Sequence, residues 1–322
     1  MEKVIIGLPR REVLGILAGV AFLAVLPLIF PSSYFMHLLV LALLYGVLAS
    51  NWDLTLGYAG IFNWAHVTIF ALGAYTAGVL SVKFGVLPWL CILAAMVVAV
   101  VAAVGICLPV LRVKGIYVVL VTFAFGQLCL HLTLGLSDYT GGSQGLVGIP
   151  AIQIGDYTFA GDGKIAYFYL ALALFFSSTY YLRRVVRSNF GLSIVALRDN
   201  EEYAVSRGIP LSRQRLITFA ASAVFTGATG AVFAFYLGVV SPEFFSFSYT
   251  ATLLTMILLG GISTIYGSLL GAFVITFISE FLVDLGPSRF LIISTISVVV
   301  MRFYPSGSWA AINGLLKSLG RR

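Results

Sequence analysis

The sequence predicts an all-α polytopic membrane protein, and three observations support this fold class. The chain of 322 residues is 60% hydrophobic and only 10% charged. Its mean hydropathy of +1.05 excludes an ordinary soluble domain. Apolar runs recur along the whole sequence, and a helix needs about 20 apolar residues to cross a bilayer. The alternating segments of about ten residues that are typical of a transmembrane β-barrel do not occur in it.

Ten apolar runs can be threaded with alternating direction, which makes residues 1–322 a single transmembrane domain with both termini in the cytoplasm. The first run has a basic start but no small-residue cleavage site, so we interpret it as a retained span rather than a signal peptide. Eight spans are the alternative, if the short pieces are re-entrant. The ten predicted spans cover residues 13–30, 34–54, 65–82, 89–111, 116–136, 165–182, 216–239, 249–259, 266–283 and 289–303.

Turn-forming and charged residues mark the ends of these spans. A proline and two serines close the first span, and a short loop separates the third span from the fourth. Basic residues follow the fourth and sixth spans at once, and a pair of glycines ends the short eighth span. These markers are Pro31, Ser32, Ser33, residues 83–88, Arg112, Lys114, Arg183, Arg184, Arg187, Gly260 and Gly261.

The distribution of basic residues supports the orientation of the threading. It puts 16 of the 19 Lys and Arg residues on the cytoplasmic side and leaves Lys83, Lys164 and Arg289 outside. The long loop after the fifth span, residues 137–163, contains aspartates but no basic residue. This asymmetry follows the positive-inside rule, which accounts for the net charge of +7 without a nucleic-acid partner.

Two apolar runs are interrupted by glycines. We call Leu56–Tyr75, "LGYAGIFNWAHVTIFALGAY", the first break and Leu259–Ala272, "LGGISTIYGSLLGA", the second break. Paired interruptions in the two halves of a membrane protein indicate a transport pathway, because irregular backbone at membrane depth must be covered by protein or line a water-filled cavity. The alternative is close helix packing through small residues, with Gly73, Gly78, Gly267 and Gly271 letting backbones approach.

Residues 188–212 form a charged segment in this apolar chain. Its apolar residues Leu192, Ile194, Val195 and Leu197 predict one short helix. A second helix is predicted from Asn200 to about Arg207, with a capping box of Asp199 and Glu202 at its start and Gly208 as its C-terminal cap. Ser212 is the predicted cap of the following span.

Two explanations fit this predicted helix pair. Neither helix is long enough to be stable alone in water, so something must pack against it. The pair is either an interfacial loop on lipid headgroups or a docking element for a cytosolic partner. The threading places it on the cytoplasmic side, among basic residues that end the sixth span and begin the seventh.

The charged segment resembles the cytoplasmic coupling loop of the branched-chain amino acid ABC transporter permeases. The resemblance extends through most of residues 51–272, with its parts in the expected order. It rests on "FAASAVFTGATGAVFA", "VVSPEFF", "LLGGISTIYGSLLGA", "LRVKGIYVVLVTFAFGQL", "TGGSQGLVGIP" and, more loosely, the first break. Within the charged segment, the matching residues are Gly191, Ala196, Leu197, Arg198, Asp199, Ala204, Gly208 and Ile209.

The resemblance implies a permease subunit of an ATP-driven importer in the bacterial inner membrane. The fold would be like that of the type II importers of cobalamin, with about ten helices. It implies a sister permease, two cytosolic ATP-binding subunits that hold ATP and magnesium, and an extracytoplasmic substrate-binding protein. This chain itself is expected to hold no cofactor. The expected ATPase-coupling residues are Gly191, Ala196, Arg198, Asp199, Glu201, Glu202 and Gly208.

Two stretches depart from the family pattern. The family usually has a Gln-Leu-Ser-Leu-Gly-His stretch where this chain has "IFNWAH", residues 61–66. In the second break, Ser263 and Ser268 stand where the family usually has Gly and Pro. The first departure lies where substrate is expected to pass. The resemblance therefore leaves open branched-chain amino acids, other amino acids, urea and short amides.

Polar residues inside the spans are the candidates for a translocation path. Ionisable side chains at membrane depth indicate function by default. Asp53 has either a gating role or simple interfacial solvation, and Glu280 is interpreted as solvated at the outer interface. A structural role remains open for His66 and for His131. The candidates for the path are Asn51, Asn63, His66, Thr122 and Gln127.

The outer loop, residues 137–163, is rich in glycine near its start. Thr140, Gly141, Gly142 and Ser143 are predicted to form an outer gate or a contact for the binding protein, and a passive connector is the alternative.

The sequence contains no recognisable catalytic or metal-ligand set. There is no Walker A loop, so the chain is not expected to hydrolyse ATP. Cys91, Cys107 and Cys129 lie inside apolar runs and are interpreted as core residues. The rival functions are an ion-coupled secondary transporter, which needs a buried carboxylate or cation site, and a passive channel for a small polar solute.

Overall fold

The computed structural model describes residues 32–286 except 155, 156, 160, 162 and 163, together with scattered positions nearer both ends of the chain. The described part is almost entirely helical, as the sequence predicts. Apart from isolated positions, the predicted spans 13–30 and 289–303 lie outside the described residues. The count of ten spans therefore stays a prediction.

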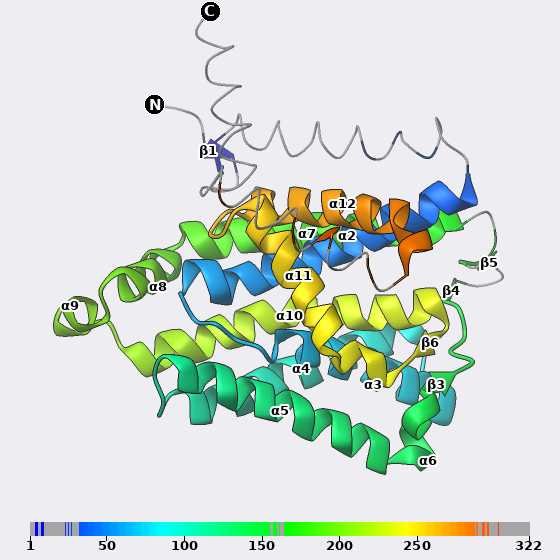
Figure 1. Ribbon diagram of the computed structural model, residues 1–322, viewed down its shortest axis with the longest axis horizontal. Coiled ribbons are helices and arrows are strands. Elements are labelled where there is room, and N and C mark those ends of the chain that lie inside the picture. Colours follow the sequence, from blue (N-terminus) through cyan, green and yellow to red (C-terminus); the bar gives the residue numbers. More distant parts are fainter. Residues whose placement is uncertain are drawn as a thin grey trace, which may run out of the picture.

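Six helices in the described part are long and apolar enough to cross a membrane. Their ends agree with most of the predicted boundaries to within about two residues. Two ends differ, because the sixth span continues through its basic residues to Arg187 and the seventh begins already at Leu211. The six helices are α2 (Ser33–Asp53), α3 (His66–Phe84), α4 (Pro88–Val110), α5 (Ile116–Gly135), α7 (Ile165–Arg187) and α10 (Leu211–Leu237) (Figure 1).

Helix α10 lies at the centre of the bundle, where it packs against α2, α3 and α4. Small residues allow this packing. A Cβ atom added at Gly73 would lie 2.8 Å from Gly227 Cα, and one added at Gly227 would lie 2.5 Å from Ala99 Cβ. Since real Cβ atoms essentially never approach other atoms this closely, any larger side chain would push these helices apart. The predicted small-residue packing is thus present at Gly73.

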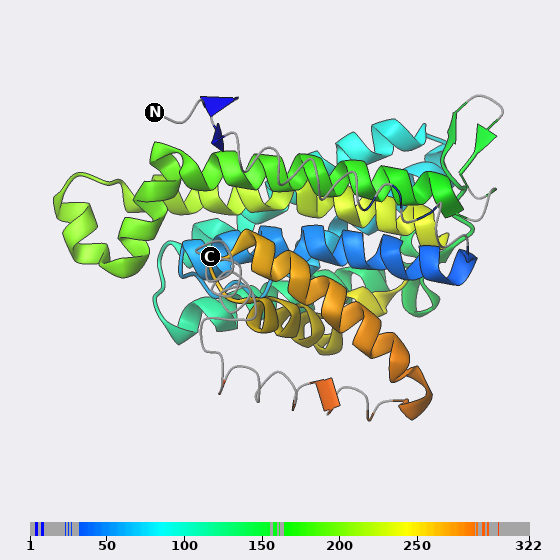
Figure 2. The same cartoon turned by 90° about the horizontal axis from the view of Figure 1, so that it is seen from above.

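Helices α11 (Phe247–Gly260) and α12 (Ile265–Phe281) form a tightly packed hairpin at the second break. The 14 residues of α11 extend over about 21 Å, which is shorter than the roughly 30 Å of a hydrocarbon core. A Cβ atom at Gly260, Gly267 or Gly271 would overlap backbone of the facing helix. Figure 2 shows α12 crossing α2 obliquely, and the two helices pack against each other.

Helix α5 is the least embedded of the six. Only Val118, Thr122, Cys129 and Thr133 are buried along its 20 residues. It runs along one side of the bundle and makes few contacts with α3 and α4 (Figure 1). Most of its surface therefore faces outward.

The bundle has two distinct ends (Figure 1). One carries α8 (Asn189–Asp199) and α9 (Glu201–Ser206), and we call it the α8/α9 end. The opposite end carries α6 (Ser137–Thr140), the 3-10 turns η2 (Gly142–Gln144) and η4 (Pro242–Phe245), and two strand pairs: β3 (Leu146–Val147) with β6 (Val239–Val240), and β4 (Gln153–Ile154) with β5 (Tyr157–Thr158). The remaining short elements are β1 (Val4–Ile5), β2 (Leu8–Pro9) and η5 (Val283–Leu285).

The first break is narrower than the sequence predicts. Helix α2 ends in a π-helical turn, η1 (Leu54–Tyr58), and the chain stays irregular until α3 begins at His66. The rest of the first break, including Gly73, is regular helix. In the second break, only the turn between α11 and α12, residues 261–264, is non-helical.

Candidate functional site

The charged segment folds into a pair of short helices, α8 and α9, as predicted. Ser188 caps α8 by accepting a hydrogen bond from Gly191 N, and Gly208 follows α9 with a φ of +88° that suits glycine. Two predicted caps are wrong. Asp199 is still helical, and Asn200, with extended φ and ψ, accepts the capping bond from Tyr203 N instead. Ser212 lies inside α10, whose cap position is Pro210.

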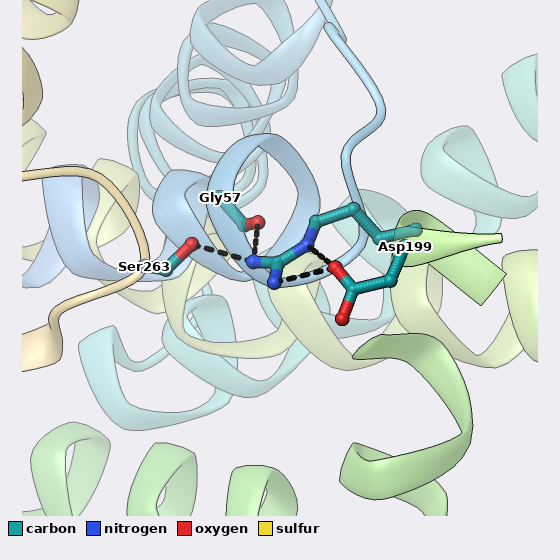
Figure 3. A network of polar contacts seen from close by, with 4 residues as sticks. Gly57, Asp199 and Ser263 are labelled. Atoms are coloured by element: carbon teal, nitrogen blue, oxygen red, sulfur yellow. Dashed lines mark hydrogen bonds and ion pairs between the residues drawn. The ribbon is translucent and has the colours of Figure 1, made fainter. Parts of the chain in front are cut away.

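Arg198 connects the helix pair to the transmembrane bundle. Its Nη1 donates to Gly57 O at 3.0 Å and to Ser263 Oγ at 2.9 Å (Figure 3). Its Nε and Nη2 both donate to Asp199 Oδ1, at 2.9 and 2.8 Å. Asp199 thus neutralises and orients the guanidinium on its own helix, while Nη1 reaches both breaks.

Asp53 joins the same set of contacts from the end of α2. Its Oδ1 accepts a hydrogen bond from Ser263 N at 2.9 Å, and its side chain is fully buried. The prediction that Asp53 is simply solvated at an interface is therefore wrong. We call Asp53, Gly57, Arg198, Asp199 and Ser263 the Arg198 network.

Two glycines of the first break leave room for the Arg198 network. A Cβ atom at Gly57 would lie 2.5 Å from Ser263 N and would overlap the carboxylate of Asp53. Gly60 has a φ of +67°, and a Cβ atom there would lie 2.6 Å from Arg198 Cγ. Neither position has room for a side chain. Glycine at these two positions therefore allows α8 and the second break to pack closely against the first break.

Ser263 adopts backbone angles that disfavour its own side chain. Its φ is +61°, one of two positive values among the non-glycine residues that the structure describes. The hydroxyl accepts from Arg198 and the amide donates to Asp53, so both polar groups gain a partner in this conformation. These bonds offset backbone strain of the order of 1–2 kcal/mol. Ser263, which stands where the family usually has Gly, is thus a residue that contacts both Arg198 and Asp53.

Replacing Ser263 with valine is expected to lower the thermal unfolding midpoint of the purified protein, whereas Ser263→Gly leaves it close to wild type. Valine is β-branched and therefore tolerates the left-handed backbone less well than serine, and it also loses the hydroxyl contact, a combined cost of roughly 1–2 kcal/mol. Glycine relieves the strain. Ser248→Val, at an exposed helical position of α11, is the matched control. Equal midpoints for Ser263→Val and Ser263→Gly would contradict the assignment of strain.

Glu201 forms a second contact between the helix pair and the bundle. Its Oε1 lies 2.8 Å from Lys114 Nζ, between α4 and α5, and its Oε2 lies 2.8 Å from Arg215 Nη2 on α10. Lys114 is 76% exposed, so its ion pair contributes well under about 1 kcal/mol. Arg215 is only 15% exposed and is therefore the stronger anchor of α9.

The remaining predicted coupling residues fall into two groups. Gly191 is buried against the end of α7, where a Cβ atom would overlap Val186 O. Ala196, Glu202 and Gly208 are exposed and face away from the bundle. The helix pair thus has one side that contacts the bundle and another side that is open.

Four predicted path residues are fully buried. Asn51 Nδ2 donates to Ser178 Oγ on α7, and Asn63 Oδ1 accepts from the amide of Ala65 within the first break. His66 Nε2 lies 3.0 Å from Thr226 Oγ1, and its ring stacks on Trp52 with a centroid distance of 5.9 Å.

Thr122 is the contact between α5 and the first break. Its Oγ1 accepts from Trp64 N at 3.0 Å. The structure thereby brings Thr122 close to the irregular part of the first break, whereas Asn51 points instead to α7. Gln127 is half-buried on α5, and in the described part no hydrogen bond joins its side chain to these four residues. His131 is exposed one turn beyond Gln127.

The start of the outer loop is a structured turn at the opposite end. Thr140 Oγ1 donates to Thr133 O at 2.6 Å and accepts from Gly142 N at 3.3 Å. Gly141 is the left-handed cap of α6, and Ser143 is exposed. Glu280, also toward this end, is half-buried and accepts a hydrogen bond from Tyr34 OH at 2.7 Å.

Sequence reasoning missed several contact residues. Gly57, Lys114 and Arg215 were not predicted to form these contacts, because their partners are distant in sequence. The glycine-rich composition of the first break was the available signal for Gly57. No local signal distinguishes Arg215 from its basic neighbours.

The described residues contain no group of three or more His, Cys, Asp or Glu side chains that could hold a metal ion. Cys91, Cys107 and Cys129 are free and buried, in agreement with their interpretation as core residues.

Comparisons with known proteins agree with this architecture. Residues 34–316 match the family described as "Branched-chain amino acid transport system / permease component". The chain is 30% identical over 288 residues to "High-affinity branched-chain amino acid transport system permease protein LivM" of Escherichia coli (strain K12), covering 83% of this chain and 68% of that protein. The protein of the same name from Salmonella typhimurium is 28% identical over the same shares. No solved structure matches the chain. With most of its length matched and six helices able to cross a membrane, the chain belongs to the family of branched-chain amino acid transport system permease components and is a multi-pass membrane protein.

Proposed function

We propose that this chain is the permease subunit of an ATP-driven importer for branched-chain amino acids, or a related small amino acid or amide, in the bacterial inner membrane. The observation that carries the proposal is the Arg198 network. Through a single side chain, the helix pair is bonded to both breaks, at Gly57 and at Ser263. A displacement of α8 is therefore transmitted directly to both breaks, with no other residue between them.

In this proposal, two cytosolic ATP-binding subunits dock on the open side of the helix pair. ATP and magnesium bind to those subunits and not to this chain. When the two ATP-binding subunits close on each other, they displace α8. This displacement changes the contacts of Arg198 and switches the opening of the translocation path from one side of the membrane to the other. Hydrogen bonds to a charged group contribute about 1.5–3 kcal/mol each when buried. Those of the partly exposed Arg198 are weaker, which suits an equilibrium between two conformations.

In the proposed topology, the α8/α9 end is the cytoplasmic end, and the N- and C-termini are cytoplasmic as well. The α8/α9 end gathers Lys114, Arg198 and Arg215, together with the basic residues at the end of α7. Lys83 and Lys164 belong to helix ends at the opposite side. This asymmetry follows the positive-inside rule. The outer loop at the opposite end then meets an extracytoplasmic substrate-binding protein.

A sister permease covers the outward side of α5. Gln127 and His131 are four residues apart and lie on one stripe of this helix, where neither is buried. Polar side chains at membrane depth face protein or water rather than lipid. The stripe therefore lines a path between two permease subunits, with Thr122 linking it to the first break. Neutral donors and acceptors of this kind suit the brief passage of a zwitterion.

The second candidate is an ion-coupled secondary transporter, and the full burial of Asp53 favours it. A buried carboxylate is the kind of residue on which cation coupling depends. Against this candidate, Asp53 lies at the end of α2, where Ser263 N already donates to it. Its position beside Arg198 favours a role in gating.

The proposal is tested first by gentle purification from native membranes with mass spectrometry of the accompanying proteins, and then by reconstitution. ATP-binding subunits and a second permease are expected to co-purify, and leucine uptake by vesicles of the complex is expected to need ATP. Uptake driven by an ion gradient with the chain alone would replace the proposal with a secondary transporter. Flux down a concentration gradient, without ATP or an ion gradient, would replace it with a channel.

A further inference from the structure

Three aromatic side chains stack where the first break meets the start of α11. The ring of Trp64 stacks on Phe62, with a centroid distance of 5.7 Å, and on Phe247, with a centroid distance of 5.4 Å. Phe62 and Trp64 lie in the irregular part of the first break and are half-buried, whereas Phe247 is the first residue of α11 and is 64% exposed. We call these three residues the aromatic stack. It bridges the first break and the helix that leads to the second break.

The aromatic stack lies at membrane depth. Trp64 N donates to Thr122 Oγ1 at 3.0 Å, and Thr122 lies six residues after Ile116, the start of α5. At 1.5 Å per residue, Thr122 is about 9 Å along a helix that is long enough to cross the membrane. Irregular backbone at this depth must be covered by protein or line a water-filled cavity. The aromatic stack therefore stands where the chain borders protein or water and not lipid.

Phe247 is held in place by the residues before it. The turn η4 precedes α11, and its Phe244 and Phe245 are buried. The ring of Phe244 lies 5.7 Å from that of Phe70, and the ring of Phe245 stacks on Tyr75 at 5.9 Å, with both partners on α3. These contacts fix the start of α11 to the regular part of α3. Phe247 is therefore the stationary side of the aromatic stack.

Trp64 lies on a segment that Arg198 contacts. Residues 59–65 belong to no helix or strand. Arg198 Nη1 donates to Gly57 O at 3.0 Å, and a Cβ atom added at Gly60, four residues before Trp64, would lie 2.6 Å from Arg198 Cγ. A segment outside regular structure changes its path at a lower cost in free energy than a helix does. A displacement of Arg198 is therefore expected to move Trp64 more than Phe247.

We propose that the aromatic stack is a gate that closes the translocation path in this conformation, and that displacement of α8 opens it by moving Trp64 away from Phe247. The inference rests on the proposed importer function and on a path along α5. Stacked aromatic rings leave no room for water between them, and a hydrophobic constriction blocks a polar solute by excluding water. A stacked pair is also a weak contact, so the gate can open and close in each transport cycle.

The test locks the aromatic stack and measures transport. Trp64→Cys and Phe247→Cys are combined in one chain, and the two thiols are joined by a bismaleimide whose linker contains a disulfide. In vesicles of the complete complex, the linked variant is expected to take up leucine at least about tenfold more slowly with ATP, because a gate that cannot open limits the transport rate. Cleaving the linker with dithiothreitol is expected to restore uptake.

Two controls accompany the linked variant. Wild type treated with the same bismaleimide tests the native cysteines, which are free and buried and are expected not to react. Trp89→Cys with Phe159→Cys is the matched control pair, because these two rings are 6.4 Å apart at a contact between the start of α4 and the outer loop. Linking this pair is expected to leave uptake unchanged.

A second pair keeps the test decisive if Trp64→Cys impairs folding. Phe62→Cys with Phe247→Cys leaves Trp64 in place and links the same two segments, so the same loss of uptake is expected. Normal uptake by either linked variant would overturn the proposal, because the first break would not have to separate from α11 during transport. An equal loss in the linked control pair would overturn it as well, because the effect would not be specific to the aromatic stack.

The same experiment separates this gate from the proposed importer function. If wild type shows no ATP-driven uptake, the importer function fails, and the linker is applied instead to the ion-driven or passive leucine flux that the chain supports. A block of that flux that dithiothreitol reverses would support the gate without the importer. Flux that persists in the linked variant would overturn the gate.

Discussion

Replacing Arg198 with alanine is expected to reduce ATP-driven uptake at least about tenfold while the permease remains folded in the membrane. The change removes the hydrogen bonds to Gly57 and Ser263, which join α8 to both breaks. Coupling free energies of about 1–3 kcal/mol correspond to changes of roughly 5–150-fold. Because the side chain of Arg198 is 32% exposed, the loss of folding stability is expected to be small. Uptake is measured in vesicles of the complete complex, together with ATP hydrolysis.

Three further variants make this prediction specific. Arg198→Lys keeps the charge but loses the planar donor fork, so an intermediate loss of uptake is expected. Glu201→Gln is expected to have a smaller effect, since its ion pairs are partly solvated. Arg184→Ala is the matched control, because Arg184 is exposed and lies over the ring of Tyr180 on its own helix, α7, outside the helix pair. Normal uptake by Arg198→Ala and Glu201→Gln would contradict the coupling role of the helix pair.

Replacing Gly227 with valine is expected to cause the largest loss of stability of any substitution considered. Gly227 lies where α10 meets both α3 and α4, and an added Cβ atom would lie 2.5 Å from Ala95 O and from Ala99 Cβ. Neither neighbour can move without shifting α4, so the helices must separate. Overpacking of this kind costs about 1–3 kcal/mol, and more where backbone is displaced. The thermal unfolding midpoint of the purified protein measures the effect.

Gly105→Val is the control for this prediction. Gly105 lies on α4, where an added Cβ atom meets no atom within 4 Å, so the same side chain enters the same kind of helix without a clash. We expect a midpoint close to that of wild type. Similar midpoints for the two valine variants would show that the approach of α10 to its neighbours does not limit stability.

Much of the fold follows from local patterns in the sequence. Helices α2, α3, α4 and α5 begin and end within about two residues of their predicted ends, because an apolar run of spanning length bounded by turns or charges has few alternatives. The prediction was less accurate at Arg187 and Leu211, where the helices continue into basic sequence. Long basic side chains can extend toward water, so charge alone does not end a helix at the membrane surface.

The candidate site was predictable only in part. The charged segment is recognisable because such residues are rare in an apolar chain, and its two short helices are present as predicted. The cap was assigned to Asp199 instead of Asn200, since both residue types suit an N-cap and only the backbone angles separate them. The partners of Arg198 were not predictable, because Gly57 and Ser263 are 141 and 65 residues away in sequence.

The sequence by itself determined the class of the protein, the position of most spans, the helix pair and the family resemblance, since each depends on composition or on short-range pattern. The tertiary structure alone decided which residues meet. It buried Asp53 and placed Ser263 between Asp53 and Arg198. The physical reason is that these contacts depend on the packing of α8 and α10 and of the two breaks. Close approach at glycines sets that packing, and no local periodicity records it.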